Sequence, residues 1–320
     1  MFGAVAGFLA VLLIVFFAAG RATGRFSRPL AIVIFLAPAL ILLVIGLVIP
    51  AVRTIVISFE HANDTVLHAN NLHLVGGRNY AWVFTTGDNQ HVLLNTVLWI
   101  VVAPVVTTAF GLLVALLVDR LKRQAVYKSL IFMPQAVSFV GASIVWRFVY
   151  ESRGAGNAQI GLLSQIVIWL GWKNPPNWIL SSPLNTFLLM VALVWVQTGF
   201  AMVVLSAAIK AIPDEIIEAA QIDGARGGKL FYLVTIPMIR NTLVVVFTTT
   251  MITTLKIFDI VRTMTGGNFG TQVLANEMYN QTFVSSDYGR GSALAVILFL
   301  GVLPLVGYNI MQLRRERSIR

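Results

Sequence analysis

Few side chains in this sequence have the chemistry of a catalytic or metal site. All four histidines, His61, His68, His73 and His91, fall within one short stretch, and their uneven spacing matches no tight metal-ligand motif. The sequence contains no cysteine, which excludes disulfides, cysteine metal sites and thiol catalysis. We therefore expect no metal site and no cofactor bound to this chain.

One stretch has part of the pattern of a phosphate-binding loop. Gly227, Gly228 and Lys229 fit the end of that motif, which also needs a glycine five residues before the second glycine and a serine or threonine after the lysine. Asp223 and Leu230 occupy those two positions instead. We expect no ATP site here, and we expect that the chain is not an enzyme.

The most informative polar stretch is the loop of residues 211–237. Pro213 suits the first position of a helix, and the two acidic residues after it suit a first turn, where the helix dipole favours negative charge. Apolar residues follow at helical spacing until Gly224, which is a stop signal. A second short helix can follow and end before Pro237. The pattern predicts a helix-turn-helix at a membrane surface, with small alanines that permit close approach by another protein.

In residue type and spacing, this loop resembles the signature loop of binding-protein-dependent ABC-importer permeases, which begins Glu-Ala-Ala. In that family the loop forms a coupling helix that docks into a groove on a separate ATPase subunit. The resemblance implies ATPase coupling for Glu218, Ala219, Ala220, Asp223, Gly224 and Pro237. The alternative is an ordinary cytoplasmic helical hairpin without a partner.

The resemblance covers most of the chain after residue 30 and is strongest to carbohydrate-importer permeases of the maltose type. Residues 258–260 (Phe-Asp-Ile) and 264–267 (Met-Thr-Gly-Gly) are typical of this sugar branch. Family members usually continue with proline, whereas this chain has Asn268, which is most similar to α-glucoside permeases. The implied cargo is an oligosaccharide or α-glucoside, with a polyol or glycerophosphodiester as the alternative.

Maltose-type permeases hold the sugar midway through the membrane, on the helices before and after the coupling loop. Matched by spacing from Glu218, those positions fall on Leu193, Val196, Gln197, Phe200, Thr250, Thr253, Thr254 and Ile257. The amide and hydroxyl groups could bond to sugar hydroxyls, and Phe200 could pack on the apolar face of a pyranose ring. The alternative is that the threonines bond to their own backbone, as they often do in membrane helices.

The family's organisation also implies the partners. They are an ATP-binding subunit dimer that holds ATP and Mg, a second and different permease subunit, an extracytoplasmic substrate-binding protein, the sugar and membrane lipid. Import would proceed by alternating access. We expect no nucleic-acid partner, because no basic stripe or aromatic platform accompanies the net charge of +10.

The elements that must position these residues are membrane helices. Hydrophobic residues make up 58% of the chain and charged residues 11%, against about 25% charged in a soluble domain. Apolar runs long enough to cross a bilayer occur at about 2–19, 30–52, 92–118, 127–149, 184–209, 236–257 and 291–313. We predict an all-α membrane protein with about seven transmembrane helices: a six-helix importer core (29–320) and an N-terminal helix with a basic loop (1–28).

The basic residues orient these spans. The first apolar run has no lysine or arginine before it, whereas Arg21, Arg25 and Arg28 follow it, which favours a retained helix with its N-terminus outside. By alternation, lysine and arginine concentrate in the loops on the cytoplasmic side, as the positive-inside rule requires. We predict a multi-pass protein of a bacterial cell membrane with the 211–237 loop in the cytoplasm.

Two other classes fit less well. A secondary transporter would show inverted repeats or charged residues in the middle of the membrane, and a membrane enzyme would show clustered catalytic groups. Lys256, Asp259 and Arg262 lie at helical spacing near the outer end of the sixth predicted span. They predict a gate or a contact with the binding protein, with a mutual salt-bridge network as the alternative.

Overall fold

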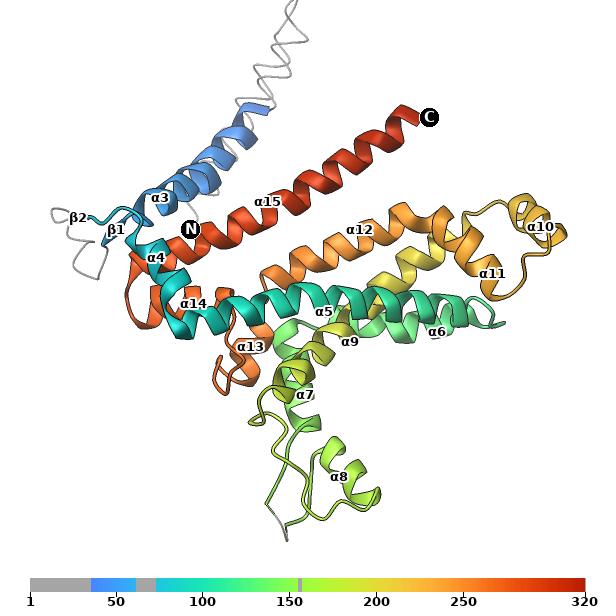
Figure 1. The fold of residues 1–320 in the computed structure, drawn as a ribbon, viewed down its shortest axis with the longest axis horizontal. Helices are drawn as coiled ribbons and strands as arrows, with labels where there is room; N and C mark the ends of the chain where they lie inside the picture. The colour runs from blue at the N-terminus through green and yellow to red at the C-terminus, as the bar shows by residue number, and fades with distance from the viewer. Residues whose placement is uncertain (1–35, 62–72, 155–156, 320) are drawn as a thin grey trace, which may run out of the picture.

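The computed structural model describes residues 36–61, 73–154 and 157–319, which are almost entirely helical (Figure 1). In chain order the labelled elements are α3 (Ile49–Ile57), β1 (Glu60–His61), β2 (His73–Leu74), α4 (Arg78–Thr85), α5 (Gly87–Val118), α6 (Gln124–Phe132), α7 (Phe139–Val149), α8 (Leu162–Trp169), α9 (Leu184–Lys210), α10 (Asp214–Ile222), α11 (Gly228–Leu230), α12 (Ile236–Leu255), α13 (Asp259–Met264), α14 (Leu274–Tyr279) and α15 (Tyr288–Ile319).

Five continuous helical segments of the described part are long and apolar enough to cross a membrane. They are Leu36–Ile57, Gly87–Val118, Leu184–Lys210, Gly228–Leu255 and Tyr288–Met311. They confirm five of the predicted spans, with boundaries that differ by several residues in places. The predicted first span, 2–19, lies outside the described residues.

The predicted span at 127–149 is not one straight helix. Its two halves, Gln124–Ala136 and Phe139–Val149, meet at an angle of 102°. Pro134 opens the break, since proline has no N–H to donate and its ring clashes with the preceding turn. The hydroxyl of Ser138 then accepts a hydrogen bond of 3.1 Å from a backbone N–H three residues on and starts a new helix. Local stop and start signals therefore combine to turn the chain.

A small antiparallel hairpin is the one departure from an all-helical fold in the described residues. β1 and β2 pair Glu60 with Leu74 and His61 with His73. Asn79 of α4 donates hydrogen bonds of 2.9 Å to the carbonyls of Ser58 and Glu60, which fixes the hairpin to the end of α3.

The core forms where α5 packs along α9 and α12 (Figure 1). Close approach of α5 and α9 depends on Gly111, because a Cβ at this position would lie 2.4 Å from the Cβ of Ala201. A Cβ on Gly199 would lie 2.7 Å from the carbonyl oxygen of Ile131, so α9 also packs tightly on the α6 side of the break. Small residues at helix crossings permit such packing within membranes.

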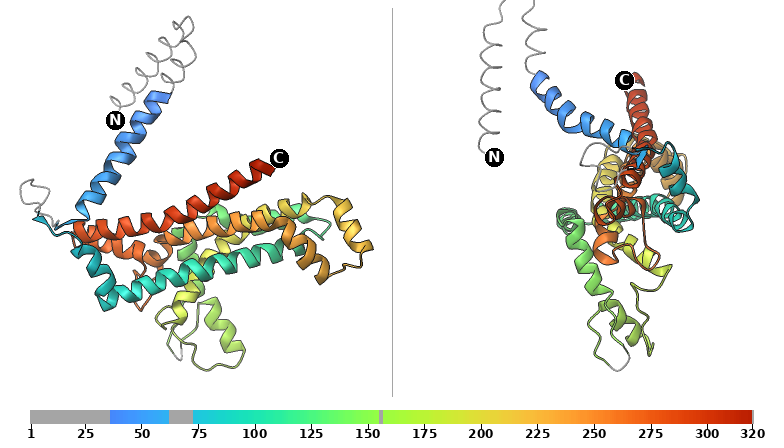
Figure 2. Two further views of the ribbon diagram at one scale, coloured as in Figure 1. Left: turned by 45° about the horizontal axis from the view of Figure 1, so that its top comes forward. Right: turned by 90° about the vertical axis from the view of Figure 1, so that its left-hand side faces the viewer.

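The segment that ends in α3 leans away from this bundle (Figure 2). None of its most apolar window is buried in the chain, and leucine, isoleucine and valine side chains along it are half exposed. Its outer end packs against the start of α15 and the rest stands apart. This helix therefore offers its apolar surface to lipid or to another subunit.

Candidate functional site

The predicted helix of the 211–237 loop is present as α10, which projects beyond one end of the spans, the end predicted to be cytoplasmic (Figure 1). Pro213 is the residue just before the helix, rather than its first member, and Asp214 and Glu215 form the acidic first turn. The helix ends at Ile222, and Gly224 follows with a φ of +85°, which is unfavourable for residues with a side chain. The N–H of Ala225 then reaches back to the carbonyl of Ala220 at 2.8 Å and closes the turn.

The candidate coupling residues lie on the surface of this loop. Glu218, Ala219, Asp223, Gly224 and Pro237 are exposed, and Ala220 is half-buried. Ile222 is 86% exposed, which is unusual for a large apolar side chain unless a partner covers it. The arrangement thus supplies an accessible helix with small residues and an uncovered apolar side chain.

The prediction that a second short helix ends before Pro237 is wrong. The helical path runs on from Gly228 to Leu255, with a π-helical turn at Phe231–Thr235. Pro237 lies in the first turn of α12, directly after this π-helical turn. The 211–237 loop is therefore joined to α12 by a continuous helical path.

Seven of the eight residues of the predicted sugar pathway lie on α9 and α12, and Ile257 lies two residues after the end of α12. Leu193, Val196, Gln197, Thr250, Thr254 and Ile257 are buried in this conformation, whereas Phe200 and Thr253 are half-buried. The three threonine hydroxyls each donate to the backbone carbonyl four residues earlier, at 2.8 to 3.1 Å. Each hydroxyl therefore donates its proton to the backbone of α12, but its oxygen can still accept a hydrogen bond from a ligand.

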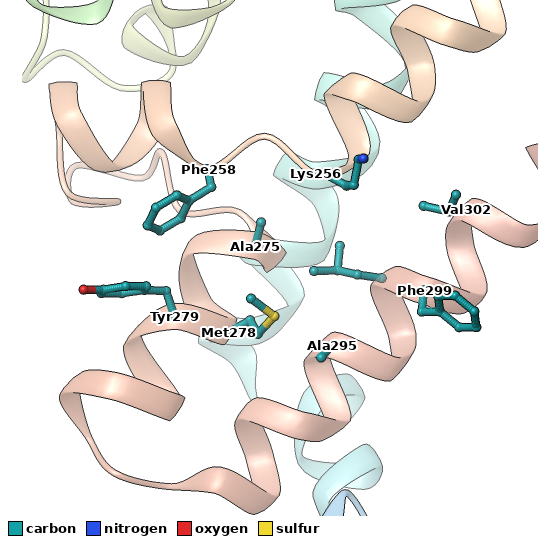
Figure 3. A pocket seen from close by; sticks show the side chains of 9 residues that line it. Lys256, Phe258, Ala275, Met278, Tyr279, Ala295, Phe299 and Val302 are labelled. Atoms are coloured by element: carbon teal, nitrogen blue, oxygen red, sulfur yellow. The ribbon is translucent and has the colours of Figure 1, made fainter. Parts of the chain in front are cut away.

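Two apolar cavities lie beside these helices, and none of the eight residues lines either of them. One, of about 620 Å³, lies between the end of α12, α14 and α15 (Figure 3). The other, of about 570 Å³, lies at the α6–α7 break, where Trp146 and Trp195 meet edge to face at 6.0 Å. In this conformation six of the eight predicted pathway residues are therefore buried within the chain and two are half-buried.

A charged cluster at the cytoplasmic ends of α5, α6 and α9 gave no signal in the sequence. The carboxylate of Asp119 lies 2.7 Å from the ammonium of Lys128 and 3.5 Å from that of Lys210. The Ser206 hydroxyl donates to the same carboxylate at 2.8 Å. Burial raises the pKa of Asp119, but the hydrogen bonds from Lys128 and Ser206 and the charges of both lysines outweigh it and hold the pKa below its usual value.

This cluster matters because of its position. Lys210 is the last residue of α9, and α10 begins four residues later at Asp214. Gln124 accepts a further hydrogen bond of 2.5 Å from Lys210, which adds the start of α6 to the contact. The partners are too far apart in sequence for any spacing rule to find them, so only the packing of the three helices brings them together.

At the opposite side of the fold, the three charged residues after α12 do not pair with one another. Among the described residues, no ion pair joins Lys256, Asp259 and Arg262, so the salt-bridge alternative is wrong. Arg262 instead donates to the side-chain oxygen of Asn280 at 2.8 Å and lies 4.7 Å above the ring of Tyr279. In the described part of the chain, no group of three or more histidine, aspartate or glutamate side chains could hold a metal ion.

Comparison with known proteins identifies the family of this chain. The family model described as "Binding-protein-dependent transport system inner membrane component" matches residues 3–319. The chain belongs to this family. The resemblance read from the 211–237 loop is thereby confirmed, and with it a multi-pass location in the membrane.

Two relatives show where in the family the chain lies. It is 45% identical over 284 residues, 88% of this chain and 82% of the relative, to an alpha-glucoside transport system permease protein of Rhizobium meliloti (strain 1021). It is 43% identical over 286 residues, 89% of this chain and all of the relative, to an osmoprotective compounds uptake permease protein of Synechocystis sp..

A solved structure supports the fold. A chain of a bacterial alginate ABC transporter, solved with an alginate pentasaccharide-bound periplasmic protein, aligns with a TM-score of 0.75 over 91% of this chain and 96% of its own. Because the two sequences are only 17% identical, this likeness bears on the fold alone.

Proposed function

We propose that this chain is a pore-forming permease subunit of an ATP-driven importer for α-glucosides or related oligosaccharides, working by alternating access. The observation that carries the proposal is α10, an exposed helix with Glu218, Ala219 and Ala220 on its surface and the Gly224 turn at its end. The 45% identity to an alpha-glucoside permease supports the cargo class. The chain would supply the pathway, while ATP and Mg would bind to a separate ATPase dimer.

The segments that join α10 to its neighbouring helices are short enough to transmit a movement of α10. On one side, three residues join it to the end of α9, and on the other, the Gly224 turn and α11 lead into the continuous helix of α12. These are the two helices that carry Gln197 and Thr254. A push on α10 by a closing ATPase would therefore move the two helices that carry these candidate contacts.

Burial of six pathway residues agrees with such a cycle. A sugar can reach Gln197 or Thr254 only if the surrounding helices move apart, since both side chains are buried in this conformation. Few polar groups within an apolar wall suit a weak, transient sugar site, from which the cargo must also leave. The same eight residues are the candidate contacts for the sugar.

The uncovered helix Leu36–Ile57 supports a second permease subunit. An apolar helix that leaves its own bundle, with no buried residue in its most apolar window, has surface for a neighbouring chain. An extracytoplasmic binding protein would deliver the sugar at the opposite end from α10. A second cargo class, small osmoprotective compounds, is favoured by the 43% identical relative and belongs in any uptake assay.

The test is purification of this chain from its host in mild detergent, followed by mass spectrometry and by uptake of labelled maltose in proteoliposomes. We expect an ATPase and a second permease to co-purify, and uptake to require ATP and the binding protein. Glu218→Ala should remove the ATPase, whereas Glu215→Gln, an exposed acid on the same helix, should retain it. Recovery of the chain alone, with uptake that needs no ATP, would show a secondary carrier instead.

A further inference from the structure

The cavity of about 620 Å³ has one charged side chain in an otherwise apolar wall. Lys256, at the end of α12, lies between Phe299 and Val302 of α15 on one side and Phe258 and Tyr279 on the other (Figure 3). None of these residues is among the eight of the predicted pathway. The volume is within the range of about 300–1,000 Å³ that is usual for small-molecule sites.

This cavity lies at the middle of the membrane. Phe299 is close to the midpoint of the Tyr288–Met311 span, and Ala295 and Val302, which also line the cavity, are one turn to either side. Lys256 follows the last residue of α12 and lines the same cavity as these residues, so it lies close to their depth.

Lys256 has no hydrogen-bond or ion-pair partner among the described residues, and its side chain is exposed. An ammonium group at this depth is unfavourable against lipid tails, so ionisable residues in such places face water, a ligand or a partner. The exposed ammonium group of Lys256 therefore indicates that this side of the cavity faces water, a ligand or a partner rather than lipid tails.

The aromatic wall beside Lys256 is held in place by further contacts. The rings of Phe258 and Tyr279 lie 5.1 Å apart, and Arg262 covers Tyr279 while it bonds to Asn280. Fixed aromatic rings in the same cavity wall as a charged hydrogen-bond donor suit a ligand with apolar C–H faces and hydroxyls. Lys256 alone offers three donors.

We infer that this cavity is a contact site for the sugar during transport, with Lys256 donating hydrogen bonds to its hydroxyls and Phe258, Tyr279 and Phe299 packing on its rings. The inference rests on the proposed function and extends the pathway from Thr254, two residues before Lys256, toward α15. It makes Lys256 a residue that selects a polyhydroxylated cargo. Lipid tails and the second permease are the other candidate occupants.

The absence of cysteine from this chain permits a direct test. Lys256→Cys places a single thiol in the cavity, and Leu300→Cys places one on the exposed face of α15 at the same depth, outside the cavity. Both variants are assembled into the complete importer in proteoliposomes and exposed to a charged, membrane-impermeant maleimide. Labelling of this chain is measured with and without maltose and the binding protein.

We expect the thiol at position 256 to react and maltose to slow its labelling several-fold, while the thiol at position 300 stays unlabelled. Labelling no greater than at position 300 would place Lys256 against lipid and overturn the inference. Two other results would also overturn the inference. One is that the thiol at position 256 reacts only in the isolated chain, and the other is that maltose does not slow its reaction with the maleimide. Sugar uptake by the wild-type importer is measured in the same proteoliposomes. If the wild type takes up no sugar, the proposed function has failed, and this result is distinct from a failure of the labelling test.

A second measurement separates contact with sugar from a structural role. Lys256→Met should lower maltose uptake by about tenfold through the loss of a charged donor, while stimulation of ATP hydrolysis by the binding protein is kept. Lys256→Arg should restore most uptake, because it returns the charge and the donors. Lys122→Met, which removes an exposed lysine in the α5–α6 turn, is the matched control and should leave uptake unchanged. Equal uptake by Lys256→Met and wild type would contradict the inference.

Discussion

Asp119→Asn is expected to loosen the cytoplasmic end of the bundle, because this carboxylate joins three helices. Asp119 follows the last residue of α5, its partner Lys128 lies on α6, and Ser206 and Lys210 lie on α9. Asparagine keeps the size of the side chain and a hydrogen bond to Ser206. It removes the negative charge that faces two ammonium groups, so the change isolates the electrostatic part of the contact.

The size of the effect follows from the burial of the pair. The side chains of Lys128 and Asp119 are 21% and 14% exposed, at a separation of 2.7 Å. Exposed ion pairs contribute about 0–1 kcal/mol, and breaking a fully buried pair costs about 3–5 kcal/mol. We expect the free energy of unfolding to fall by about 2 kcal/mol, between these limits. Asp287→Asn, which breaks the more exposed pair with Arg290 at 3.5 Å, should cost less than about 1 kcal/mol.

The assay is denaturant unfolding of the purified chain in detergent, as a double-mutant cycle of Asp119→Asn with Lys128→Met. We expect a coupling energy of about 1–2 kcal/mol, since the two groups contact each other directly. In the assembled importer, the same change should reduce the sugar imported per ATP hydrolysed, because α9 leads into α10. A coupling energy near zero, or an equal loss for Asp287→Asn, would refute the reasoning.

Acidification gives an independent check with a definite sign. The pKa of Asp119 is lowered in the folded chain, so the unfolded chain takes up a proton first as the pH falls. Its stabilising contribution is complete above the ordinary aspartate range and is lost as the pH falls through the lowered pKa. The difference in stability between wild type and Asp119→Asn should thus be constant near neutral pH and shrink below about pH 4. A difference that persists unchanged in acid would assign the contact to packing rather than charge.

Three further predictions follow from backbone geometry and packing. Gly224→Ala should strain the turn after α10 by about 1 kcal/mol, because φ is +85°, and should lower the yield of co-purified ATPase. Gly111→Ala should lower the unfolding temperature by driving a methyl group to 2.4 Å from α9, whereas Gly46→Ala, with open space around it, should not. Asn95→Ala removes donors to two carbonyls of the outer loop, at 2.6 and 3.1 Å, and should cost about 1–3 kcal/mol in unfolding measurements.

Local properties of the sequence were enough to find most of the elements. The length of an apolar run determines whether a helix can cross the membrane, and five predicted spans are present as continuous helices. Helix α10 forms where Pro213, two acids and the Gly224 stop signal predict it, because caps and turns depend on residues only a few positions apart. The Glu218-Ala219-Ala220 motif then indicated the family, which the comparison confirmed.

The sequence also misjudged particular places for physical reasons. Pro134 breaks its span while Pro104 and Pro304 remain within helices, because the effect of a proline depends on whether neighbouring groups let the helix continue. Pro237 was expected to follow the end of a helix, but a π-helical turn before it lets the chain continue into α12.

Composition and local spacing by themselves determined that this chain crosses a membrane many times, presents a short helix in the 211–237 loop and carries no cysteine chemistry. Tertiary structure alone decided that Gln197 and Thr254 are buried, and that Asp119 meets Ser206 from 87 positions away. It also placed Lys256 beside a cavity at mid-membrane. The reason is that hydrophobic length and helix caps are set by neighbours in the chain, whereas burial and charge pairing are set by neighbours in space.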